Sequence, residues 1–169
     1  MKQGLSVAVV LLLAACAPLP PAPAPTGPAP PTAAAIVAAV REAGQAGAEL
    51  VVTPLVDAQV KDLRLAAAAA EAAAAFEQAD AALAKALNIS PDEPDLLQWR
   101  AEIAVLRGAR AEAEALARRS IELGPKSGPL CRRNWTLLKL LREGRGEAEN
   151  VASAAAMLER CTIAPPVRM

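Results

Sequence analysis

The residues that most often carry chemistry are few in this chain. Histidine is absent from the 169 residues, and cysteine occurs three times, as Cys16, Cys131 and Cys161. Without histidine the chain cannot build a Ser-His-Asp or Cys-His catalytic arrangement. It also lacks the usual nitrogen ligand of zinc sites. We therefore expect no metal and no cofactor other than a covalent lipid on one cysteine.

Carboxylates are the remaining groups that could act in catalysis. A pair of carboxylates could cleave glycosidic bonds. Here, however, the glutamates are spaced as on the solvent-facing sides of helices. We therefore expect solvent-exposed, non-catalytic positions for Glu71, Glu77, Glu102, Glu112 and Glu114. Gly144-Arg145-Gly146 has neither the length nor the Lys-Ser/Thr ending of a phosphate-binding loop. We do not expect an enzyme, and a formal net charge of zero disfavours nucleic acid as a partner.

Cys16 is placed for lipid attachment. Lys2 and the apolar run Val7–Leu13 are typical of an export signal, and the run is too short to span a bilayer as a helix. Leu13-Ala14-Ala15-Cys16 resembles a bacterial lipobox, which implies cleavage after Met1–Ala15 and acylation of Cys16. The alternative is an ordinary cleaved signal that happens to contain a cysteine. With Ala17 after the cysteine, the sorting rule for such lipoproteins favours the outer membrane, with the chain facing the periplasm.

A linker should separate this anchor from the folded part. Eight prolines fall within Ala17–Pro31, and such a segment favours extended polyproline II rather than a core. Fifteen residues would then reach roughly 45 Å from the bilayer. We assign residues 16–33 to the acylated cysteine and linker. Residues 34–56 are assigned to a short helix, capped by Thr32 and running through Val40 with Gly44 as a natural stop, and to an irregular lead-in.

A repeat of about 34 residues organises the rest. Pro91 and Pro125 stand one such period apart, and equal steps back from them match the pairs Leu63/Leu97, Ala67/Ala101, Ala70/Ala104, Ala79/Ala113, Leu87/Ile121 and Ile89/Leu123. This period, with small residues at fixed positions and a closing proline, resembles the tetratricopeptide repeat (TPR). An alanine-rich helical bundle with accidental periodicity is the alternative.

The resemblance implies an all-α fold of three helical hairpins. Small residues would let the helices cross closely, Ala67 with Ala79 and Ala101 with Ala113. Gly108 stands at the turn of the second unit, and Ala74 at that of the first. A degenerate third unit would run over Leu130–Glu143 and Glu147–Cys161, with its register slipped by one or two residues. The repeat domain would span residues 57–161, and residues 162–169 would form a tail that Pro165 and Pro166 keep from being helical.

Cys131 and Cys161 would fall at adjacent ends of the third hairpin. A disulfide needs that proximity, and an oxidising periplasm preserves it. A redox or metal site is the competing interpretation, but no CxxC motif is present.

The TPR resemblance also implies a groove along the first helix of each hairpin. Projected onto this chain, its wall consists of Lys61, Arg64, Gln98, Trp99, Glu102, Arg132, Arg133, Thr136 and Lys139. Trp99 would be an apolar anchor for a bound partner. Alternatively, Trp99 packs inside the protein and the arginines only solvate the surface.

These observations predict a lipid-anchored periplasmic module that binds a protein or peptide in the cell envelope, with pilus or outer-membrane assembly as the setting typical of such lipoproteins. The alternative is a structural envelope spacer without a groove ligand.

Overall fold

The computed structural model describes residues 30–47 and 56–162. The predicted signal peptide, Cys16, nearly all of the linker, and the tail beyond Thr162 lie outside the described residues. Within them the fold is all-α, as predicted: seven helices and no strand. The helices are α1 (Ala33–Gln45), α2 (Ala58–Ala72), α3 (Phe76–Ile89), α4 (Pro94–Leu106), α5 (Arg110–Leu123), α6 (Pro129–Glu143) and α7 (Ala148–Arg160).

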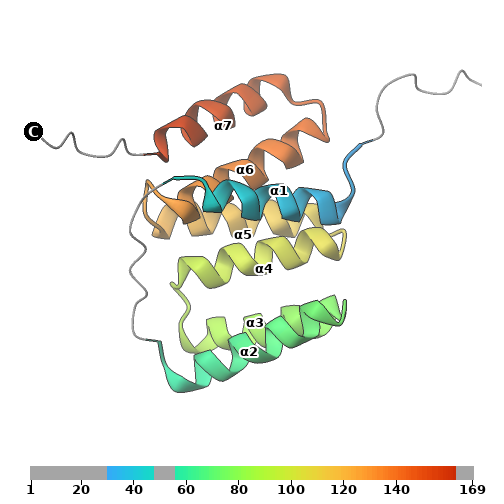
Figure 1. Ribbon diagram of the computed structural model, residues 1–169, viewed down its shortest axis with the longest axis vertical. Helices are drawn as coiled ribbons and strands as arrows, with labels where there is room; N and C mark the ends of the chain where they lie inside the picture. The colour runs from blue at the N-terminus through green and yellow to red at the C-terminus, as the bar shows by residue number, and fades with distance from the viewer. Residues whose placement is uncertain (1–29, 48–55, 163–169) are drawn as a thin grey trace, which may run out of the picture.

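Six of the helices pair in chain order (Figure 1). α2 packs against α3, α4 against α5, and α6 against α7. The pairs then contact one another through α3 with α4 and α5 with α6. The helix ends follow local chemistry: α3 and α5 end just before Pro91 and Pro125, and α4 and α6 begin on prolines, which suit the first helical position.

The turns inside the first two pairs occupy equivalent positions. Gly108 has φ +79°, and Ala74, one repeat period earlier, has φ +54°. A residue with a Cβ rarely adopts this left-handed conformation, so the hairpin geometry holds Ala74 there. In the third pair the equivalent residue is Gly146, at φ +71°. One period of 34 residues after Gly108 is position 142, and Gly146 lies four residues beyond it. The register therefore slips by four residues, rather than by the predicted one or two.

Alanines permit the close crossings. Ala67, Ala79, Ala101 and Ala113 are all fully buried. α4 lies at the centre, because one side of it joins a core with α2 and α3 while another joins a core with α1, α5 and α6. A helix that is buried on nearly every side has little amphipathic character.

α1 differs from its prediction in length and position. Thr32 caps it as expected, accepting a hydrogen bond from the Ala35 backbone N–H at 3.2 Å. The helix continues through Gly44 to Gln45 because Gly44 is buried, with the Arg133 side chain packed against it. Rather than forming a separate lead-in, α1 packs on α6 and α4 (Figure 1).

Candidate functional site

The predicted groove wall is divided into a covered part and an open part. Four of its nine residues are buried on the two helices on which α1 packs: Gln98 and Glu102 of α4, and Arg132 and Thr136 of α6. We call this face of α4 and α6 the α1 seat. The prediction that Glu102 faces solvent is wrong, because its side chain is 0% exposed.

α1 fills the seat with an apolar stripe and a polar end. Ile36, Val37 and Val40 join a core with Leu137 and Leu141 of α6, among others. This stripe follows helical spacing, so one side of α1 is buried while the other stays exposed.

The C-terminal end of α1 is held by the two adjacent arginines of α6. The last carbonyls of a helix have no partner within it, and Arg132 Nε donates to one of them, Ala43 O, at 3.0 Å. The cation also suits the negative end of the helix dipole. A Cβ on Gly44 would lie 2.8 Å from Arg133 Cγ and Cδ, so this close approach requires glycine. Arg132 and Arg133 of the predicted groove wall therefore hold a helix, and that helix belongs to the same chain.

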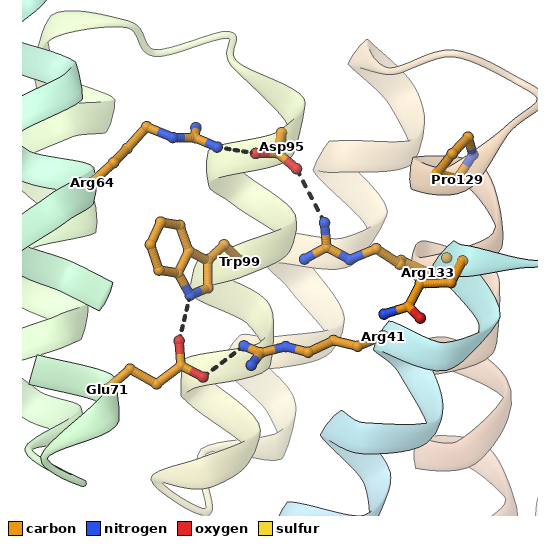
Figure 2. A pocket seen from close by; sticks show the side chains of 9 residues that line it. Arg41, Arg64, Glu71, Asp95, Trp99, Pro129 and Arg133 are labelled. Atoms are coloured by element: carbon orange, nitrogen blue, oxygen red, sulfur yellow. Dashed lines mark hydrogen bonds and ion pairs between the residues drawn. The ribbon is translucent and has the colours of Figure 1, made fainter. Parts of the chain in front are cut away.

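Beside α1 the wall is open as a pocket of about 510 Å³ (Figure 2). It lies where α1, α2, α4 and the start of α6 meet, and its lining consists of Arg41, Gly44, Gln45, Arg64, Glu71, Asp95, Trp99, Pro129 and Arg133. Three predicted groove residues, Arg64, Trp99 and Arg133, come together here.

Glu102 is the buried centre of an ion-pair network behind the pocket. Its Oε2 accepts from Arg41 Nε at 2.8 Å, and its Oε1 accepts from Arg133 Nη2 at 2.7 Å. Gln98 Nε2 donates to the same Oε1 at 3.2 Å. A carboxylate without water is stable only with such partners. Burial alone would lower the pKa of Arg41, but its bonds to Glu102 and Glu71 raise that pKa above its ordinary value.

Two further carboxylates complete the network at the pocket surface. Glu71 accepts from Trp99 Nε1 at 2.8 Å and pairs with Arg41 Nη2 at 2.7 Å. Asp95 pairs with Arg64, and with Arg133 Nη1 at 3.1 Å (Figure 2). Three arginines thus balance three carboxylates within the network, whereas the pocket lining itself holds the three arginines and two of the carboxylates, because Glu102 lies behind it.

Trp99 and Arg64 form the wall of the pocket on the side of α2. The Arg64 guanidinium carbon lies 5.7 Å from the centre of the Trp99 ring, within the range of a cation–π contact. Trp99 is therefore fixed by an arginine over its ring and by a carboxylate at its indole nitrogen. Part of its surface packs on the core of the first hairpin.

The remaining two predicted residues lie elsewhere. Lys61 is exposed on α2, and Lys139 pairs with Glu143 on α6 at 2.7 Å. Neither lines the pocket.

Arg41, Glu71 and Asp95 were not among the predicted groove residues. Asp95 had a detectable signal, because it precedes Trp99 by four positions and Glu102 by seven, on one face of a helix. Arg41 had none, since only the docking of α1 brings it to Glu71 and Glu102.

Cys131 and Cys161 meet as the hairpin geometry predicts. Their sulfur atoms are 1.99 Å apart, and they join the start of α6 to the residue after α7. Gly128 adds a backbone bond at the same place, donating its N–H to Cys161 O at 2.7 Å.

The described residues contain no cluster of three or more His, Cys, Asp or Glu that could hold a metal ion. None of the helices in residues 30–47 and 56–162 combines the length and the apolar character needed to cross a membrane. Comparison with protein-family models, curated proteins and solved structures finds no match to the chain.

Proposed function

We propose that the protein is a lipid-anchored periplasmic interaction module, in which three TPR-like hairpins present a binding pocket to a protein or peptide of the cell envelope. The lipobox-like sequence at Cys16 and the proline-rich linker support the anchor. The repeat period, the equivalent turns at Ala74 and Gly108, and the pairing of helices in chain order support the repeats.

The observation that carries the binding role is the pocket beside α1. It combines a tryptophan with arginines, which are residue types enriched among the energetically dominant residues of interfaces, and it also holds two carboxylates. Trp99 and Arg64 are held in place before any partner arrives, so little conformational entropy is lost on binding. A peptide with both charges and one apolar side chain suits this lining.

One observation favours the alternative of a structural envelope spacer. The α1 seat, which makes up nearly half of the predicted wall, is already filled by the chain's own helix. The binding role therefore depends on the open pocket alone.

A capture experiment on envelope fractions separates the two functions. The wild-type chain should retain a partner that Trp99→Ala and Arg64→Ala lose, because these changes remove the apolar anchor and one guanidinium group. Lys85→Ala, on the far hairpin helix α3, is the matched control and should retain it, since Lys85 does not line the pocket. Recovery of the same proteins with all four chains would refute the pocket and leave the spacer. Separately, Cys16→Ala should move the chain from the membrane fraction to the soluble fraction.

A further inference from the structure

The charged side chains that line the pocket have hydrogen-bond donors to spare, whereas every carboxylate oxygen already has a partner. Glu71 accepts from an indole and an arginine, and Asp95 accepts from two arginines, one at each oxygen. Each guanidinium group carries five N–H donors. Within the described part of the chain, Arg41 Nη1 and both Nε and Nη1 of Arg64 form no hydrogen bond or ion pair. The groups left for a ligand are therefore mainly donors.

The two arginines with spare donors are accessible. The side chains of Arg41 and Arg64 are 41% and 31% exposed. They come from α1 and α2, on two sides of Trp99 (Figure 2). Accessible N–H groups bond water in a free protein, so a ligand that displaces this water has to supply acceptors of its own. A ligand that brought only further donors would leave these groups without partners, which costs affinity.

The charge of the lining favours an anion with a single charge. Three arginines against two carboxylates leave an excess of one positive charge. The carboxylate that balances it, Glu102, is 0% exposed, and arginines hold both of its oxygens. Hydrogen bonds between a guanidinium group and a carboxylate are charge-assisted and stronger than neutral ones. One excess charge matches a carboxylate better than a doubly charged phosphate.

We propose that the pocket binds a peptide through one of the peptide's carboxylates, which bonds to Arg64 and Arg41 beside Trp99. The inference rests on the proposed function, because it assumes that a peptide occupies this pocket, and it identifies which charge of the peptide enters. An acidic side chain and a free C-terminus offer the same chemistry.

A library of immobilised octapeptides, probed with the full chain, tests the proposal. One arm has random sequences with amidated C-termini, and the other has free C-termini and no aspartate or glutamate. The peptides that bind wild type and Lys85→Ala but not Trp99→Ala should be rich in aspartate or glutamate in the first arm, which identifies a side-chain carboxylate, or confined to the second arm, which identifies a terminal one.

The failure of the inference differs from the failure of the proposed function in this experiment. Peptides that depend on Trp99 but are rich in lysine or arginine, or show no preference for a carboxylate, would overturn the inference and leave the binding role intact. The absence of any peptide that depends on Trp99 in either arm would overturn both.

Two charge changes at the pocket should alter the affinity for a selected peptide in opposite directions. Asp95→Asn removes a negative charge and releases donors of Arg64, so binding should become roughly fivefold tighter. Arg64→Gln should weaken binding about tenfold or more, because it removes a charged donor. Asp92→Asn is the matched control and should change nothing, since Asp92 pairs with Arg119 outside the pocket.

Isothermal titration calorimetry measures these affinities, and circular dichroism checks that each variant is folded. A folded Asp95→Asn that binds the peptide more weakly would contradict the proposal, because the pocket would then be receiving a cation. Inorganic phosphate should compete with the peptide no better than acetate at equal ionic strength. A clear preference for phosphate would overturn the assignment of a carboxylate.

Discussion

The α1 seat and the pocket are adjacent parts of one wall, and α4 contributes to both. In the seat, leucines and valines pack tightly around α1, and the polar groups are enclosed. In the pocket, arginines and carboxylates of the same network reach the surface and line an open cavity together with Trp99. The difference shows how a helical scaffold can use one stretch of wall for stability and leave the next available for contact.

The first prediction contrasts the two parts directly. Leu137 is 0% exposed under α1, and Leu137→Ala should cost about 4 kcal/mol of unfolding free energy through the cavity that it leaves. Arg64→Ala, at the pocket, should cost less than about 1 kcal/mol, because its ion pair with Asp95 is about one-third exposed on each side. Urea denaturation measures both values, and equal losses would contradict the division of roles.

The second prediction concerns the disulfide that holds α6, one wall of the seat. It closes a separation of 30 residues, which corresponds to about 3.5 kcal/mol on the chain-entropy model. Reduction, or the double change Cys131→Ala/Cys161→Ala, should lower the unfolding free energy by about that amount. The hydrogen-exchange protection of α2, on the pocket side, should fall less than that of α6 and α7. If reduction leaves stability unchanged, the bond does not constrain this hairpin.

The smallest expected change in stability concerns the turn between α2 and α3. Ala74 has φ +54°, and Ala74→Gly should relieve the conformational strain and raise stability by up to about 1 kcal/mol. Ala73→Gly is the matched control, since Ala73 has φ −84° and glycine there should stabilise nothing. A midpoint of thermal unfolding that rises for Ala74→Gly alone supports the prediction, and a rise for neither variant contradicts it.

Local sequence preferences accounted for most of the helical framework. Proline limits the helices around positions 91 and 125, alanine is an excellent helix former, and the repeat period places Ala74 and Gly108 at equivalent turns. The meeting of Cys131 with Cys161 also followed from the expected antiparallel hairpin. The third hairpin was predicted within one residue of α6 and α7, with its turn between Glu143 and Glu147, but the size of its register slip was misjudged.

The site was predicted less well, for a reason visible in Gln98, Glu102 and Arg132. These residues have the polarity of an open groove wall, and by sequence alone they look solvated. They are enclosed because α1 returns across the wall from the far end of the chain. A helix of alanine, valine and isoleucine could dock on many surfaces, so its own sequence does not specify which one.

The sequence by itself determined that this protein is helical, where its first two hairpins turn, and which cysteines could meet, since each depends on backbone preference or short-range periodicity. Tertiary structure decided which part of the wall is covered and which residues share the pocket. Those outcomes depend on contacts such as Arg41 with Glu102 and Arg132 with Ala43, between positions separated by 61 and 89 residues. Such contacts contribute to stability only after the helices have packed against one another.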